Sequence, residues 1–101
     1  MKSPAIGCVK AASEALGDKW TPQLLRFFIN NEVVRFCQIQ ELVGGINPRT
    51  LSARLVSLES SGIIEKLPTD NSSRCEYILT QKGRDIMPII KEMERWSTTY
   101  S

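Results

Sequence analysis

The stretch over residues 47–62 constrains the fold most, because it carries a helix signal at each end. The side-chain oxygen of Asn47 can accept a hydrogen bond from a free backbone N–H of the first turn, and Pro48 at the next position loses no hydrogen bond there. Gly62 can adopt the left-handed conformation that ends many helices. Between these signals three leucines recur at helical spacing and define a core-facing side, namely Leu51, Leu55 and Leu58. We therefore expect one amphipathic helix here.

The side of this helix opposite the leucines is short, polar or basic. Its residues are Arg49, Ala53, Ser57 and Ser60, with Thr50, Ser52 and Arg54 on the flanks. No Asp or Glu occurs between residues 42 and 58. Small side chains let a helix approach a DNA major groove, Arg can reach guanine edges or phosphates, and Ser or Thr can bond either. The pattern is typical of a DNA-reading helix, although a solvated face on an ordinary amphipathic helix is the alternative.

The chain before this helix predicts three shorter helices and a tight turn. Apolar residues at helical spacing indicate a first helix over about residues 7–16 and a third over about residues 38–43. Thr21 and Pro22 form a cap-and-proline start for a second helix, which we expect to run to about residue 30. Residues 32–36 fit either a very short strand or helical turns. Gly44 and Gly45 then join the third helix to the next by a short turn, which predicts a helix-turn-helix.

A β-hairpin is predicted after Gly62, where the apolar spacing changes from helical to alternating. Two β-like runs flank a segment rich in turn-forming residues, and their apolar members are Ile63, Ile64 and Leu67 in one run and Cys75, Tyr77 and Leu79 in the other. A polar hairpin directly after a helix-turn-helix is the wing of a winged helix. Arg74 beside the tip and Lys66 on the other strand are placed to meet a phosphate backbone or a minor groove.

The last predicted helix runs over about residues 81–98, with Thr80 as its cap. An apolar stripe follows its length, formed by Ile86, Ile89, Ile90, Met93 and Trp96. Pro88 within it should kink the helix or delay its start. The stripe offers more apolar surface than one small core is expected to cover. We therefore infer a dimer interface, and the alternative is that the stripe is the last face of the core.

Size and residue usage indicate a single domain over residues 1–101 without a catalytic centre. Histidine is absent, and no paired nucleophile and base, phosphate loop or metal cluster is visible. The sequence thus favours neither an enzyme nor a bound cofactor or metal. Three cysteines without a CxxC pair argue against a disulfide framework, and the net charge of +2 is a weak argument for nucleic acid. Without a membrane-spanning apolar run or a secretory signal, we expect a cytoplasmic protein.

The order of these elements resembles the HxlR-type transcriptional regulators, a branch of the MarR-like winged-helix proteins. The resemblance covers residues 8 to about 96 and rests on residues at the element junctions, which are 17–21 (GDKWT), 35–36 (RF), 45–48 (GINP), Leu51, 54–55 (RL), 58–59 (LE), 62–63 (GI), 76–77 (EY), 79–80 (LT) and 82–83 (KG). It implies an α+β, mainly helical, winged helix-turn-helix whose first and last helices hold a homodimer.

The implied function is a regulator of transcription that binds double-stranded operator DNA in a sequence-specific way. By position, the resemblance places on the recognition helix Asn47, Arg49, Thr50, Ser52, Ala53 and Arg54, and it places Arg74 on the wing. A winged-helix module that binds a protein partner instead of DNA is the alternative, because a fold does not fix a function.

Cys8 occupies the position of an N-terminal cysteine that senses electrophiles or oxidants in some members of the family. A thiolate is favoured at a helix start near a cation, and Lys10 is close in sequence. A buried, inert cysteine is the alternative. Cys37 and Cys75 depart from the family pattern and are either core fillers or additional thiols. The effector, whether an oxidant or a small molecule, is not readable from the residues.

Overall fold

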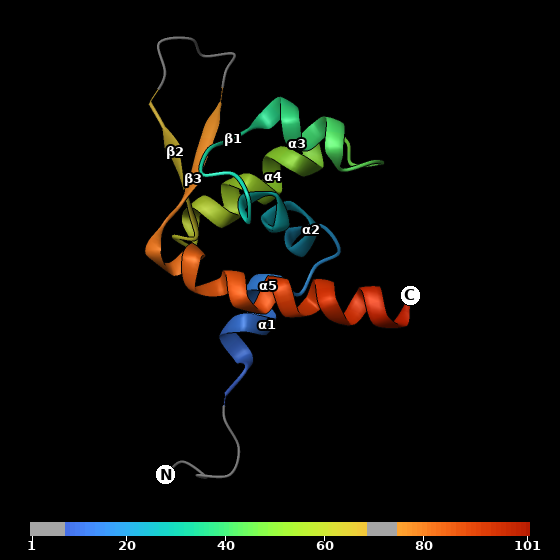
Figure 1. Cartoon of the computed structure of the whole chain (residues 1–101). Coiled ribbons are helices and arrows are strands. Elements are labelled where there is room, and N and C mark those ends of the chain that lie inside the picture. The colour runs from blue at the N-terminus through green and yellow to red at the C-terminus, as the bar shows by residue number, and fades with distance from the viewer. Residues whose placement is uncertain (1–7, 69–74) are drawn as a thin grey trace.

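The computed structural model describes residues 8–68 and 75–101. Its elements are α1 (Lys10–Leu16), α2 (Thr21–Leu25), the short 3-10 helix η1 (Arg26–Phe28), β1 (Val34–Arg35), α3 (Phe36–Leu42), α4 (Pro48–Ser60), β2 (Ile64–Leu67), β3 (Glu76–Leu79) and α5 (Gln81–Tyr100). In Figure 1 the strands stand beside the group formed by α2, α3 and α4, while α5 runs across below them. The mainly helical α+β architecture that we predicted is confirmed.

The strands form one antiparallel sheet with the order β1-β3-β2. β2 and β3 pair from Ile64 opposite Leu79 to Leu67 opposite Glu76, which confirms the predicted hairpin. β1 adds two residues on the other edge of β3, with Val34 opposite Tyr77. The strand alternative for this segment therefore holds, and α3 begins directly after the strand. The hairpin tip over residues 69–74 lies outside the described residues.

A core of apolar side chains joins the helices to the sheet. The three leucines of the α4 stripe are at most 3% exposed, as their spacing predicted. They belong to one buried cluster with residues from α2, α3, the sheet and α5, among them Leu24, Leu25, Ile39, Ile64, Tyr77 and Ile90. Burying a leucine stabilises a fold by about 1.5–3 kcal/mol. This cluster therefore fixes the position of α4 and leaves the opposite side of the helix outward.

Local signals at the ends of α4 and α5 act as predicted. Asn47 Oδ1 accepts a hydrogen bond from the Thr50 N–H at 2.8 Å, and Gly62 has a φ of 77°. Thr80 Oγ1 accepts from the Gly83 N–H at 3.1 Å. Of the two effects that we predicted for Pro88, a kink or a delayed start, the delayed start is wrong, because α5 begins at Gln81 behind the Thr80 cap and continues through the proline.

The start of α2 differs from the prediction. Asp18 Oδ1 accepts from the backbone N–H groups of Trp20 and Thr21, each at 2.8 Å, and the Thr21 hydroxyl donates to Asp18 Oδ2. Thr21 is thus the buried first residue of the helix, and its predicted role as cap is wrong. A carboxylate offers more acceptor positions than a hydroxyl, which donates to it here. The α-helix also ends early at Leu25, and η1 continues it to Phe28.

Candidate nucleic-acid interface

The turn between α3 and α4 lies near the aromatic ring of Trp20. Gly45 has a φ of 85°, a conformation that side chains other than glycine rarely adopt. A Cβ atom added at Gly45 would lie 4.0 Å from Cη2 of Trp20. Ile46, the next residue, is buried. The helix-turn-helix that we predicted is therefore formed, and its turn rests on a residue that precedes α2.

The outward side of α4 gathers most of the residues predicted from the sequence. Exposed there are Arg49, Ser52, Ala53 and Ser57, while Thr50 is half-buried. Val56 is 60% exposed on the same side, three residues after Ala53 and seven after Arg49. Val56 was not among the residues predicted from the sequence, because its side chain is neither polar nor basic. Its position opposite the leucines was the available signal.

Arg54 is engaged within the protein. Its Nη1 lies 3.7 Å from Oδ2 of Asp18, and the two side chains are 36% and 33% exposed. The guanidinium therefore links the flank of α4 to the start of α2. Among the described residues, Arg49 is the arginine of α4 that has no such ion pair.

The carboxyl of Asp18 is held in its ionised form. Partial burial alone raises its pKa, but hydrogen bonds from the Thr21 hydroxyl and from the N–H groups of Thr21 and Trp20 lower it. The positive charge of Arg54 lowers it further, and the net effect is a pKa below 3.8. At neutral pH this carboxylate can therefore act at once as the cap of α2 and the partner of α4.

The three cysteines lie at different depths. Cys8 is exposed two residues before α1, so the buried alternative for this thiol is wrong. Cys37 is exposed in the first turn of α3, and Cys75 is half-buried just before β3. Lys66 is exposed on β2. The predicted wing residue Arg74 lies outside the described residues.

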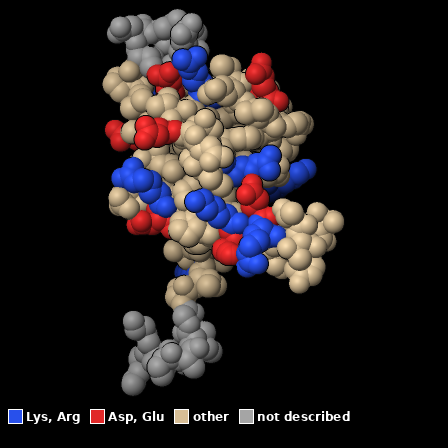
Figure 2. All heavy atoms as spheres, viewed as in Figure 1, with Lys and Arg blue, Asp and Glu red and all other residues tan. Residues whose placement is uncertain are grey.

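Charge is mixed on the face shown in Figure 2, where Lys and Arg side chains alternate with Asp and Glu. No single basic patch dominates that view, as expected for a net charge of +2. Any attraction to nucleic acid therefore depends on the placement of a few cations, such as Arg49, and not on the overall charge of the protein.

The apolar stripe of α5 divides between the core and the surface. Ile90 is 2% exposed and packs in the core. Four other large apolar side chains remain exposed by 40% to 71%, namely Ile89, Met93, Trp96 and Tyr100. The rings of the last two pack against each other at a centroid distance of 5.1 Å, with their planes tilted by 40°. Within the described residues, no helix is long and apolar enough to cross a membrane.

The model of the HxlR-like helix-turn-helix family matches residues 15–101. The chain belongs to this family. Among similar proteins, the HxlR-family chain is 32% identical over 90 residues to the helix-turn-helix-type transcriptional regulator YvaP of Bacillus subtilis (strain 168), which covers 88% of this chain and 82% of that protein. It is 37% identical over 95 residues to the regulator Rv3095 of Mycobacterium tuberculosis (strain H37Rv), covering 91% of this chain and 58% of that protein.

Solved structures agree with this assignment. The redox regulator HypR in its oxidised form superposes with a TM-score of 0.85 at 28% identity, covering 92% of this chain and 96% of HypR. The reduced form of the transcriptional regulator YodB from B. subtilis gives a TM-score of 0.75 at 26% identity, covering 99% and 95%. The HxlR-family chain is therefore a winged helix-turn-helix protein of a family of transcriptional regulators.

Proposed function

We propose that this HxlR-family protein is a cytoplasmic, single-domain regulator that binds double-stranded operator DNA as a homodimer and reads sequence with α4. The observation that carries the proposal is the outward side of α4. It combines an exposed Arg49 without an ion pair in the described residues with three small neighbours, which are Ser52, Ala53 and Ser57. Such a surface can enter a major groove closely enough for base contacts.

Within this proposal the residues of α4 have two roles. Arg49, Thr50, Ser52, Ala53 and Ser57 face the DNA, whereas Asn47 and Arg54 orient the helix, because their side chains already bind the Thr50 N–H and Asp18. Val56 adds an apolar group that can contact the methyl group of thymine. Arg74 and Lys66 of the wing are proposed to contact the phosphate backbone.

The homodimer is proposed to form through α5 and α1. The exposed side chains of α5 make a continuous apolar surface, and Val9 just before α1 is 72% exposed. Monomeric proteins rarely leave contiguous apolar surface of this kind open to water. A two-fold dimer would present two copies of α4 to successive major grooves of a palindromic site.

The deciding experiment is a binding titration against duplex DNA from the upstream region of the protein's own gene, with random duplex as a control, at two salt concentrations. We expect tighter binding to the upstream duplex and a steep loss of affinity as salt rises, because cations released from phosphates drive association. Arg49→Ala should weaken binding by about 1–3 kcal/mol and relax base preference. Arg95→Ala removes the same charge from α5 and should leave affinity unchanged.

An affinity that does not change with salt would contradict DNA binding. If neither duplex binds even at low salt, the alternative of a protein-interaction module is favoured, since Leu42 at the end of α3 and Val56 on the outward side of α4 are each 60% exposed. An equal effect of Arg49→Ala and Arg95→Ala would show that only net charge matters, and it would refute the role of α4 in reading bases.

We further propose that Cys8 responds to oxidants or electrophiles. The thiol is exposed, which such chemistry requires. HypR, a redox regulator with structures in reduced and oxidised forms, shares the fold. After mild oxidant, a disulfide-linked dimer band or a mass shift should appear in the wild type and be absent in Cys8→Ser. Identical behaviour of the two proteins would refute the proposal.

A further inference from the structure

The C-terminal end of α4 and the first turn of α5 are bonded to each other, although the whole hairpin lies between them in the chain. In Figure 1 the end of α4 lies at the base of the hairpin, where β3 passes into α5. We call this contact the α4–α5 joint, and it comprises residues 61–63 and 79–83. It contains three of the residue pairs that carry the family resemblance, 62–63 (GI), 79–80 (LT) and 82–83 (KG). None of these pairs is on the outward side of α4, so the proposed base contacts give no reason for them.

The Thr80 hydroxyl serves both helices at once. It accepts a hydrogen bond from the Gly83 N–H at 3.1 Å and thereby caps α5. As a donor it lies within hydrogen-bond distance of two carbonyl oxygens that follow α4, those of Gly62 and Ile63, the second at 3.1 Å. The Thr80 N–H also donates to the Ile63 carbonyl oxygen, at 3.0 Å. Because a hydroxyl has one proton and two acceptor lone pairs, this one group can bind the end of α4 and the start of α5 together.

Lys82 and Gly83 hold the joint from the α5 side. Lys82 Nζ donates to the carbonyl oxygen of Ser61, the residue directly after α4, at 2.7 Å. A cation in the first turn of α5 gains nothing from the dipole of its own helix, but this one lies at the C-terminal end of α4, where a positive charge is stabilising. A Cβ atom at Gly83 would lie 2.2 Å from the Ile63 carbonyl oxygen. The backbone of α5 therefore lies directly against the chain that ends α4.

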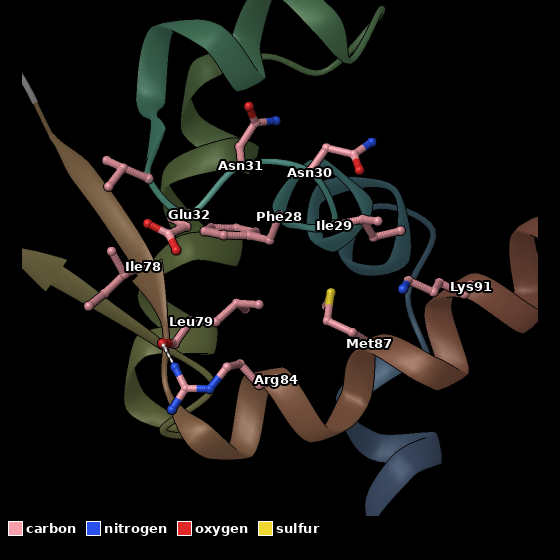
Figure 3. Close-up of a pocket in the computed structure, with 11 residues that line it drawn as sticks. Phe28, Ile29, Asn30, Asn31, Glu32, Ile78, Leu79, Arg84, Met87 and Lys91 are labelled. Carbon is pink, nitrogen blue, oxygen red and sulfur yellow. Dashed lines mark hydrogen bonds between the residues drawn. The ribbon is translucent and has the colours of Figure 1, made fainter.

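The first turn of α5 is also bonded to the strand before it. Arg84 donates from Nη1 to the Leu79 carbonyl oxygen at 3.2 Å, and Figure 3 shows this bond at the end of β3. A second bond runs from Arg84 Nη2 to Gln81 Oε1 at 3.0 Å. The hairpin ladder begins at the same place, with Ile64 opposite Leu79. A rotation at the joint would therefore break bonds of the ladder or of the α5 cap.

A small rotation at the joint is amplified along α4. Arg49 lies 12 residues before Ser61, which corresponds to about 18 Å along a helix. A tilt of α4 by about 5° would move Arg49 by about 1.6 Å, whereas a precise binding site tolerates about 0.5 Å. The leucines of α4 hold it against the core by contacts that are not directional, so they resist such a tilt less than the hydrogen bonds of the joint do. Freedom at the joint alone is therefore enough to misplace the side chains proposed to read bases.

We propose that Thr80 and Lys82 are positioning residues, which fix the angle of α4 relative to α5 through the α4–α5 joint and thereby determine how selectively α4 reads DNA. In a homodimer formed through α5, each joint sets where its copy of α4 stands relative to the two-fold axis. The effect on selectivity rests on the DNA binding and the homodimer proposed above. The angle between the two helices depends on neither.

The first measurement is the angle between α4 and α5, from residual dipolar couplings of backbone N–H groups in the full-length protein without DNA. Thr80→Val nearly keeps the shape of the side chain and removes the hydroxyl, and it should tilt α4 by about 5° or more, or lower its couplings relative to those of α5. Thr80→Ser keeps the hydroxyl and should preserve the wild-type angle. Thr98→Val removes a hydroxyl that donates to the Glu94 carbonyl oxygen within α5 and should have no effect.

The second measurement is selectivity, the ratio of the affinity for duplex from the upstream region of the protein's own gene to the affinity for random duplex. Thr80→Val should lower this ratio about tenfold, as expected for the loss of one base contact. Binding to random duplex should change much less, because phosphate contacts carry no sequence information. Lys82→Met, at an exposed position, should act in the same direction. Lys91→Met removes the same charge later in α5 and should leave both the angle and the ratio unchanged.

An unchanged angle in Thr80→Val would overturn the proposal, and so would an equal change in Thr98→Val. A changed angle with an unchanged ratio would show that the joint has no part in selectivity, and it would overturn the proposal too. If Thr80→Val does not fold, Lys82→Met decides by the same two measurements. If the wild type itself does not distinguish the two duplexes, the proposed DNA reading fails and the effect on selectivity fails with it, while the angles still decide whether the joint fixes α4.

Discussion

Replacing Asp18 by Ala tests whether one carboxylate supports both α2 and α4. The substitution removes the acceptor for two backbone N–H groups at the start of α2, an effect of about 0.5–2 kcal/mol for a helix cap. It also leaves the hydroxyl of Thr21, a residue 3% exposed, without its partner, which costs about 1–3 kcal/mol if no water replaces it. The partly exposed pair with Arg54 adds about 0.2–1 kcal/mol. Together these contributions amount to an expected loss of about 2–6 kcal/mol.

The assay is urea unfolding at neutral pH and fixed protein concentration, because a dimer's stability depends on concentration. A double-mutant cycle with Arg54→Met, which keeps most of the apolar stem, separates the ion pair from the cap. We expect a coupling energy below about 1 kcal/mol for this exposed pair. Asp18→Asn keeps an acceptor without the charge and should lie between the wild type and Asp18→Ala. A loss below about 0.5 kcal/mol for Asp18→Ala would refute the capping role.

The Asp18 cap also makes the stability of the fold depend on pH in the acid range. The folded pKa of Asp18 lies below its usual value of 3.8, so its ionised form stabilises the fold above that pH. The contribution is lost as the pH falls below 3.8 and through the folded pKa. The stability gap between the wild type and Asp18→Asn should therefore narrow in this window. A gap that stays constant there would contradict the lowered pKa.

Three further substitutions test other contacts. Gly83→Ala should destabilise the protein by about 1–3 kcal/mol in thermal or urea unfolding, because the added Cβ would overlap the backbone carbonyl oxygen of Ile63. This loss should outweigh the higher helix propensity of alanine. Unchanged stability would contradict the close packing of Gly83 against Ile63. Burial raises the pKa of Tyr77 to about 12, helped by Cys75 and Glu59, so ultraviolet titration should show a late phenolate step that Tyr77→Phe removes. Trp96→Asp should shift sedimentation from dimer to monomer without loss of helix content, and an unchanged dimer would place the interface elsewhere.

Much of the fold was predictable because its signals are local. Asn47 and Thr80 cap their helices through bonds that span three residues, and the leucine spacing of α4 shows its buried side without knowledge of the partner. The residues that sequence reasoning placed wrongly or missed depend on distant contacts. Thr21 looked like a cap until Asp18 was seen to accept its hydroxyl, and Val56 gains meaning only once the outward side of α4 is defined.

The candidate sites divide in the same way. Arg49 and Arg54 look equivalent in sequence, since both are arginines on the non-leucine side of one helix. The structure separates them, because the position of Asp18, which is 36 residues away along the chain, decides that Arg54 binds the protein. A groove of about 650 Å³ between the end of η1, β3 and α5 (Figure 3) was not predictable from the sequence, since its walls come from segments about 50 residues apart, such as Phe28 and Leu79.

Residues 17–21 are among those on which the resemblance to the family rests, and their contacts in the structure give a physical reason for this. Asp18 joins the start of α2 to Arg54 of α4, the ring of Trp20 lies near Gly45 of the turn, and the hydroxyl of Thr21 donates to Asp18. None of these residues lies on the outward side of α4. They support α4 from its buried side, and the base reading proposed for α4 would depend on this support because a misplacement of about 1 Å is enough to lose the geometry of a site.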